Sequence, residues 1–293
     1  MNRPQTLLVA TDFSPSARAA EDAGVAWAKR FGSTLHWIHA LEVPLPIFEP
    51  YAVAVPEATI GATRKAAQEK LEAAAARGTE EGLDGTSHLG DVPAAYAIAD
   101  RAEELGADLV VIGTHGHRGV RRVILGSVAE KAVKLAPCSV LTVKGEKGAE
   151  APDRILVGVD FSDHTGPALD AATTLAKETG ASLHLLHALE LRIPLVTAYE
   201  VTIPDGIIEQ AQAEAEVQLA ALADGVDKAV PVSWSMRSAP PHQAIVEAAE
   251  DEGADLIVTG SRGMTGLKHA LLGSVAERTL RASPCSVWTV RAS

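Results

Sequence analysis

The chain has 293 residues, about twice the length of a typical single domain, so two domains are expected. Its formal net charge of −12 disfavours nucleic-acid binding, which depends on clustered Lys and Arg side chains that displace counterions from phosphates. Hydrophobic residues make up 47% of the chain and aromatic residues only 4%, which indicates cores of Ala, Val, Leu and Ile packed in layers.

The strongest apolar run near the N-terminus, residues 7–10, is far shorter than the core of a signal peptide. No stretch approaches the length that crosses a bilayer. We therefore predict a cytoplasmic protein with no membrane insertion.

Short apolar runs alternate with helical stretches. Residues 6–10 and 109–112 are continuously apolar, which is typical of parallel strands covered on both faces. The sequence predicts strands at 6–10, 86–90, 109–112 and 139–143, and helices at 14–30, 92–105 and 128–135. This alternation predicts an α/β fold with a doubly wound, five-stranded parallel sheet of the Rossmann-like type. Ligands of such sheets bind at the carboxyl ends of the strands.

The whole pattern occurs twice. Leu-Val-Ala-Thr-Asp-Phe-Ser at residues 8–14 matches Leu-Val-Gly-Val-Asp-Phe-Ser at 156–162, an offset of 148. His-Trp-Ile-His-Ala-Leu-Glu at 36–42 matches His-Leu-Leu-His-Ala-Leu-Glu at 184–190 with the same offset. Residues 145–153 are polar and rich in breakers, as a linker should be. We predict tandem domains at 1–147 and 152–293.

A glycine pattern follows the predicted strand 109–112. Gly113 and Gly116 are followed by nine residues and then by Gly126-Ser127 at the start of a helix. The second copy repeats the spacing with Gly260, Gly263 and Gly273-Ser274. Glycines let bare amides approach phosphate oxygens, and a helix start adds free N–H groups and a positive dipole end. The pattern predicts an anion cradle in which Ser127 and Ser274 cap the helix and donate to a phosphate.

Two other loops are excluded by the same residues. A Walker loop would need Gly-Lys-Ser/Thr, and a dinucleotide-binding loop would need Gly-x-Gly-x-x-Gly, and neither follows the strand. Ordinary turns and caps remain an alternative for the glycines, but the matched spacing of two copies favours the cradle.

Asp12 and Asp160 end the first strand of each copy, at the expected crevice. A carboxylate there could accept a hydrogen bond from a ribose or adenine group, or it could be the N-cap of the next helix, and both roles can coexist. His36, His39, His184 and His187 invite a metal interpretation. Residues three apart on a strand point to opposite faces, however, so we expect packed or hydrogen-bonded histidines and assign no metal ligand.

These motifs resemble the universal stress proteins, whose ATP-binding members carry Gly-x2-Gly-x9-Gly-Ser/Thr after the fourth strand. The likeness covers nearly all of residues 5–291 and includes the Asp that ends the first strand and the Pro-Cys-Ser-Val that opens the last. The resemblance implies an adenine nucleotide alpha hydrolase-like fold, with ATP, together with Mg²⁺, as the ligand. It also implies a homodimer of tandem chains.

The resemblance assigns nucleotide contacts residue by residue. In the first copy the backbone at Ala10 and Ala40, with Asp12, would contact adenine and ribose. The ribose and phosphates would lie on Ile112, Gly113, Gly116, Gly126, Ser127 and Val128. The second copy would supply Gly158, Asp160, Ala188, Thr259, Gly260, Gly263, Gly273, Ser274 and Val275.

Three functions remain open. The first is a nucleotide-dependent stress-response regulator, whose ATP occupancy alters the surface that a protein partner meets. The second is a slow ATPase, although the loops contain no duplicated general base and no shared arginine, so we assign no catalytic residue. The third is a scaffold without nucleotide, against which the intact glycine spacing argues.

Overall fold

The computed structural model describes residues 3–41, 47–48, 51–52, 56–114, 125–145, 149–190, 206–263 and 272–292. The chain divides into two compact units, Asn2–Glu150 and Ala151–Ser293, and each is described by itself. Within the described residues, no helix combines the length and the apolar character needed to cross a bilayer.

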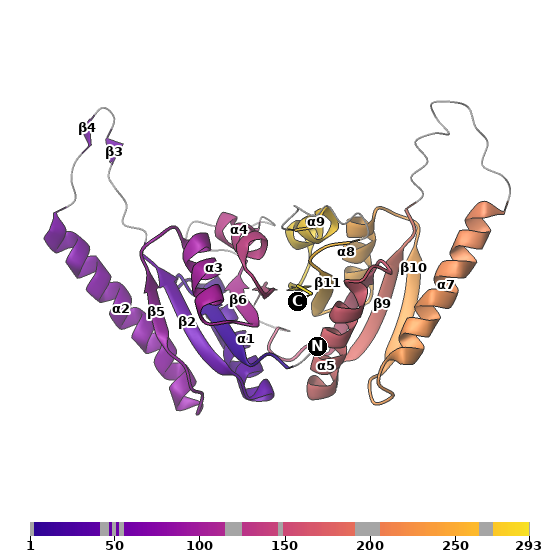
Figure 1. The fold of residues 1–293 in the computed structure, drawn as a ribbon, viewed down its shortest axis with the longest axis horizontal. Coiled ribbons are helices and arrows are strands. Elements are labelled where there is room, and N and C mark those ends of the chain that lie inside the picture. The colour runs from indigo at the N-terminus through magenta and orange to yellow at the C-terminus, as the bar shows by residue number, and fades with distance from the viewer. Residues whose placement is uncertain are drawn as a thin grey trace. The chain divides into compact units, whose positions relative to one another are not determined.

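The first unit alternates strands and helices along the chain (Figure 1). Its elements are β1 (Thr6–Ala10), α1 (Pro15–Phe31), β2 (Thr34–Ala40), β3 (Ile47–Phe48), β4 (Tyr51–Ala52), α2 (Glu57–Glu80), β5 (Ser87–Gly90), α3 (Ala94–Glu104), β6 (Leu109–Gly113), α4 (Ser127–Leu135) and β7 (Ser139–Val143). The five strands of the main sheet lie in the order β5-β2-β1-β6-β7 and are all parallel. β3 and β4 form a separate antiparallel pair.

The second unit repeats this sheet. Its elements are β8 (Arg154–Val159), α5 (Thr165–Thr179), β9 (Ser182–Ala188), α7 (Ile207–Gly225), β10 (Val232–Arg237), α8 (Pro241–Asp251), β11 (Leu256–Gly260), α9 (Ser274–Ala282) and β12 (Ser286–Val290). The strands lie in the order β10-β9-β8-β11-β12, again parallel. The predicted doubly wound α/β fold with five parallel strands per copy is therefore confirmed.

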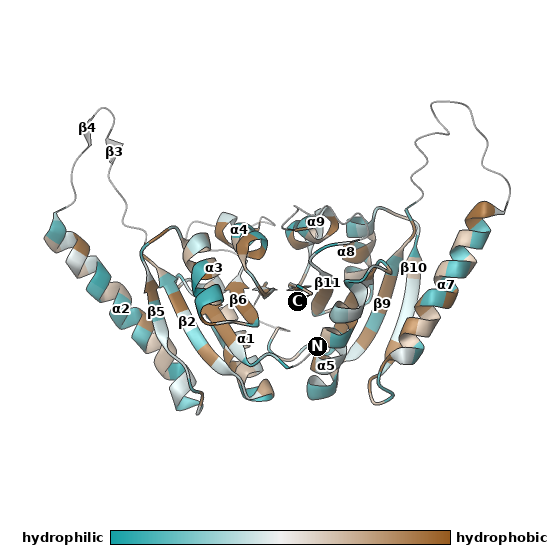
Figure 2. Ribbon diagram, viewed as in Figure 1, coloured by the Kyte–Doolittle hydropathy of each residue, from teal (hydrophilic) through white to brown (hydrophobic). Residues whose placement is uncertain are grey.

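Helices cover both faces of each sheet. In the first unit α1 and α2 contact each other on one face, and α3 packs against α4 on the other. Strands buried on both faces should be continuously apolar, and in β1 all residues from Leu7 to Ala10 are buried. Figure 2 shows the same contrast: β6 is largely apolar, whereas α2 is largely polar.

Local signals define α1 well. Ser14 is its N-cap and accepts a hydrogen bond from the Ala17 N–H, Pro15 is the first helical residue, and Gly32 ends the helix with a left-handed backbone at φ 70°. Trp27 of α1 is fully buried, and its indole N–H donates to the Ala149 carbonyl at 2.7 Å. Ala149, in the middle of the predicted linker, is thus buried against the first unit.

The two helical glycines of α2 make a matched test of this packing. A Cβ on Gly78 would lie 2.2 Å from Cη2 of Trp37, whereas a Cβ on Gly61 would meet no heavy atom within 4 Å. We expect Gly61→Ala to raise the free energy of unfolding by up to about 1 kcal/mol, because alanine favours a helix. Gly78→Ala should lower it by about 1–3 kcal/mol, because the new methyl overpacks the core. Urea denaturation measures both, and shifts of the same sign would contradict this packing.

Candidate functional site

The site lies where the strand order reverses. In the first unit the chain passes from β1 to β2 and β5 and then crosses back to β6, on the other side of β1. Ala10 near the end of β1 pairs with Ile112 near the end of β6. In the second unit β8 and β11 take these places, and Val157 pairs with Val258. Ligands of open parallel sheets bind outside the carboxyl ends of the strands at such a reversal.

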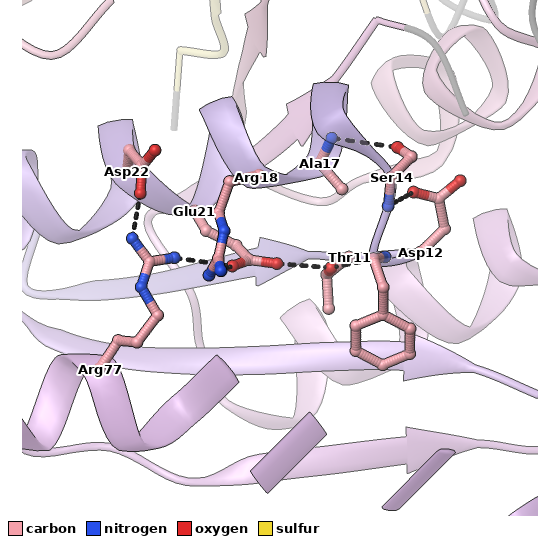
Figure 3. Close-up of polar contacts among 9 residues, drawn as sticks. Thr11, Asp12, Ser14, Ala17, Arg18, Glu21, Asp22 and Arg77 are labelled. Carbon is pink, nitrogen blue, oxygen red and sulfur yellow. Dashed lines mark hydrogen bonds and ion pairs between the residues drawn. The ribbon is translucent and has the colours of Figure 1, made fainter. Parts of the chain in front are cut away.

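A tight turn follows the first strand of each unit. Phe13 and Phe161 have left-handed backbones, with φ of 64° and 57°, which is uncommon for a residue with a bulky side chain. In the first unit the Ser14 N–H donates to Asp12 Oδ1 at 3.0 Å, which closes an Asx turn (Figure 3). Each turn therefore presents an aspartate at the strand end.

The second aspartate has additional partners. Asp160 Oδ1 accepts from the Ser162 N–H at 3.0 Å, the Ser162 hydroxyl at 2.6 Å and the Thr165 hydroxyl at 3.0 Å. The prediction that these aspartates could be helix N-caps is wrong in both units. The N-cap is Ser14 in α1 and His164 in α5, because the turn places Asp12 two residues and Asp160 four residues before the cap.

A histidine from the neighbouring strand supports each turn. His39 Nδ1 lies 2.8 Å from the Thr11 carbonyl oxygen, and His187 Nδ1 lies 2.8 Å from that of Val159. Because a carbonyl only accepts, Nδ1 carries the proton and Nε2 remains an acceptor in the neutral ring. Each ring also packs against the phenylalanine of its turn, with centroids 4.5 Å apart. Sequence reasoning found these histidines but missed this role.

Gly113 and Gly260, the last residues of β6 and β11, lie against the starts of α1 and α5. A Cβ on Gly113 would come within 2.6 Å of the Ser16 carbonyl oxygen. A Cβ on Gly260 would meet the Cβ of His164 at 3.0 Å. Neither position has room for a side chain, so the glycines allow the strand ends and the helix starts to approach closely.

In the second unit the loop glycine and the aspartate come together. A Cβ on Gly263 would lie 2.7 Å from Asp160 Oδ2. The two predicted features of this unit, the carboxylate after the first strand and the glycine loop after the fourth, thus lie side by side at the strand ends. Gly116, the counterpart of Gly263, lies outside the described residues.

The loops return to the strand ends. The Gly126 N–H donates to the Thr114 carbonyl at 2.7 Å, and the Gly273 N–H donates to that of Ser261 at 2.8 Å. Each bond closes the loop at its base. The starts of α4 and α9 consequently lie beside the ends of β6 and β11, where the glycine spacing predicts them.

The N-caps of α4 and α9 are not the residues that the sequence predicts. The N-caps are Gly126 and Gly273, with no side-chain cap bond, and Ser127 and Ser274 are the first helical residues. The prediction that the serines cap the helices is therefore wrong. Both serines are exposed, and the first three N–H groups of each helix have no acceptor within the helix.

The other predicted contact residues lie around the same crevices. They occupy the last two positions of their strands or the first turn of a helix: Ala10 in β1, Ala40 in β2, Ile112 in β6, Val128 in α4, Gly158 in β8, Ala188 in β9, Thr259 in β11 and Val275 in α9. The arrangement in each unit offers backbone amides, one carboxylate and one exposed hydroxyl.

Two buried polar atoms of the second unit were missed by sequence reasoning. Ser261 Oγ and His164 Nδ1 are buried and have no hydrogen-bond partner among the described residues. Ser261 directly follows Gly260, and His164 packs against it. The one sequence signal is that Ser261 follows Gly260, a glycine whose spacing is repeated in both copies.

The remaining histidines lie on the other side of the strands. His36 Nδ1 lies 2.9 Å from Thr86 Oγ1, and His184 is within 2.9 Å of the Ser233 hydroxyl and 2.7 Å of the Ser235 hydroxyl. The prediction of hydrogen-bonded histidines is confirmed. Burial lowers the pKa of His36 and of His184, and burial together with the charge of Arg101 lowers the pKa of His88.

Comparison with known proteins supports the repeat. The model of the universal stress protein family matches residues 4–144 and again 152–291. A universal stress protein of Mycolicibacterium smegmatis is 27% identical over 97% of this chain and 96% of its own. Universal stress protein YxiE of Bacillus subtilis is 36% identical over 47% of this chain and 99% of its own.

A solved structure shows the same fold. The crystal structure of a universal stress protein from Archaeoglobus fulgidus superposes with a TM-score of 0.69 and covers 98% of both chains. Its sequence identity is 24%, so this likeness concerns the fold alone.

The lowered histidine pKa values predict acid sensitivity. The folded pKa of His36, His88 and His184 lies below the unfolded value of about 6.5, so folding favours the neutral rings. Their contribution is fully present above about pH 6.5 and is lost as the pH falls through the folded pKa values. Urea midpoints between about pH 7.5 and 5 should fall, and less so in the triple variant His36→Gln, His88→Gln, His184→Gln. An equal fall in both proteins would refute this assignment.

Proposed function

The chain belongs to the universal stress protein family, and we propose that it is an ATP-binding member that holds one nucleotide with Mg²⁺ in each half and acts as a nucleotide-dependent stress-response regulator. The observation that carries this proposal is the duplicated arrangement at the strand ends, where an aspartate turn lies after the first strand and a loop closed at its base leads from the fourth strand into a helix start.

The amides of α4 and α9 suit a polyanion. Their first N–H groups point out of the helix start, and the dipole of each helix places a partial positive charge there. The hydroxyls of Ser127 and Ser274 are exposed at the same end and can donate to a phosphate oxygen. Mg²⁺ would neutralise part of the triphosphate charge.

Polar atoms at the second crevice fit a ligand rich in donors and acceptors. Ser261 Oγ is buried without a partner among the described residues, and a buried hydroxyl is stabilised by a partner. Asp160 Oδ2 borders Gly263 and can accept from a ribose hydroxyl. Asp12 holds the corresponding place in the first unit.

Identifying the nucleotide tests the proposal directly. The purified full chain is denatured, and the supernatant is separated by nucleotide chromatography. We expect ATP. ADP together with measurable turnover would favour slow hydrolysis instead, and no binding under saturating ATP would refute the proposal in favour of a scaffold.

Valine substitutions in the glycine loops should remove the sites. Gly263→Val would push a side chain onto Asp160 Oδ2 and into the phosphate approach, so bound ATP should fall from two per chain to one. Adding Gly116→Val should abolish binding without unfolding. Gly225→Val is the matched control, because a Cβ there meets no heavy atom within 4 Å. Calorimetry measures the stoichiometry, and unchanged ATP affinity in the folded double variant would contradict the cradle.

A further inference from the structure

A buried carboxylate connects three elements of the first unit. Glu21 of α1 is 3% exposed. It accepts hydrogen bonds from Thr11 Oγ1 at 2.7 Å, from Arg77 Nη1 at 2.9 Å and from Arg18 Nη1 at 3.3 Å (Figure 3). Thr11 follows β1, whereas Arg77 lies in the last turn of α2. This cluster, called here the Glu21 network, comprises Thr11, Glu21, Arg18, Arg77 and Asp22.

The network reaches the aspartate turn through Thr11. While its hydroxyl donates to Glu21, its oxygen accepts from the Phe13 N–H at 3.0 Å. Phe13 is the residue with the left-handed backbone, and the next amide, that of Ser14, holds Asp12. Two consecutive hydrogen bonds therefore connect the buried carboxylate to the strained residue that positions Asp12.

At its other end the network anchors α2. Arg77 contacts Asp22 as well as Glu21, so its guanidinium spans two carboxylates of α1. Besides this arginine, α2 buries Ala67, Leu71, Ala74 and Gly78, of which Leu71 is fully buried. Arg77 is thus a charged contact from the last turn of α2 to α1, and Glu81, directly after the helix, adds an exposed ion pair with Lys29 of α1 at 2.5 Å.

The second unit builds the same turn without these charges. At the offset of the repeat, Val159 replaces Thr11 and Leu169 replaces Glu21, and both are buried. Gly225 ends α7 at the position that corresponds to Arg77. Phe161 nevertheless has φ 57°, and the hydroxyls of Ser162 and Thr165 hold Asp160. The Glu21 network is therefore not required to form the turn.

We propose that Thr11, Glu21 and Arg77 are positioning residues that make ligand binding in the first half depend on the docking of α2. The inference rests on the proposed nucleotide site. With α2 docked, Arg77 holds Glu21, Glu21 orients the Thr11 hydroxyl, and the Phe13 amide is fixed. Without Arg77 the buried carboxylate loses its main cation, and the Asp12 turn loosens. By linkage, nucleotide in the first site stabilises the docked helix, whereas the second site has no such dependence.

The test uses the full chain carrying Gly263→Val, so that only the first site binds. In this background Arg77→Gln should weaken ATP binding roughly 5- to 100-fold. Arg77→Lys should restore part of the affinity, because a cation again meets Glu21. Arg64→Gln is the matched control on the same helix, since the Arg64–Asp91 ion pair is exposed and does not reach Thr11. It should leave the affinity unchanged.

A second variant distinguishes loss of the Glu21 network from a general loss of folding. Thr11→Val with Glu21→Leu introduces the apolar residues that the second unit buries beside a similar turn, in which Phe161 also has a left-handed backbone. Hydrogen exchange then reports coupling: ATP should slow exchange of α2 amides near Arg77 in the parent chain and not in this variant. Equal ATP-induced protection in both proteins would overturn the inference.

The exchange of one amide separates this inference from the proposed function. Even without nucleotide, the Phe13 amide should exchange faster in Arg77→Gln than in the parent and in Arg64→Gln. If the parent binds no ATP but this difference is present, the nucleotide proposal fails while the link between α2 and the turn holds. If ATP binds and the Phe13 amide is indifferent to Arg77, the positioning role is refuted.

Discussion

The left-handed backbone of Phe13 and Phe161 is the constraint from which each site is built. A non-glycine residue in this region costs on the order of 1–2 kcal/mol, so surrounding contacts must hold it there. Each turn has the same two supports. A histidine ring packs against the phenylalanine and hydrogen-bonds to the carbonyl two residues before it, and the aspartate accepts from the N–H of the residue after the phenylalanine. The left-handed residue lets the chain turn directly after the strand, so the aspartate stays at the strand end.

The close approach of glycines completes the crevice. Gly113 and Gly260 let the helix after the turn lie directly against the end of the fourth strand, where a Cβ would meet backbone or Cβ atoms. The turn and the glycine loop are distant in sequence, and they form one site only because the strand order brings β1 beside β6 and β8 beside β11.

Much of this could be predicted from the sequence. Continuous apolar runs predicted the strands, and glycines at equal spacing in both copies predicted the loops, because both patterns follow from backbone geometry. The helix caps were misassigned because Ser127 and Gly126 are adjacent and both suit an N-cap, and only the closure onto Thr114 decides between them. Glu21 was missed because two of its partners, Thr11 and Arg77, lie on other elements. A charged residue on the buried face of α1, among Ala17, Gly24 and Ala28, was the one available signal.

The charged Glu21 network of the first unit and the apolar residues at the same positions of the second unit respond differently when a helix moves. Removing one partner of a buried ion pair costs about 3–5 kcal/mol when both groups are fully buried, and less here because Arg77 is 33% exposed. Separating apolar side chains costs only about 25 cal/mol for each Å² exposed, so the loss grows gradually with movement. A shift of α2 that separates Arg77 from Glu21 therefore breaks discrete contacts that lead to the first turn, whereas the second unit has the buried apolar residues Val159 and Leu169 at the positions of Thr11 and Glu21. A duplicated domain can in this way keep one fold and one site geometry while only one of its halves responds sharply to the helix beside it.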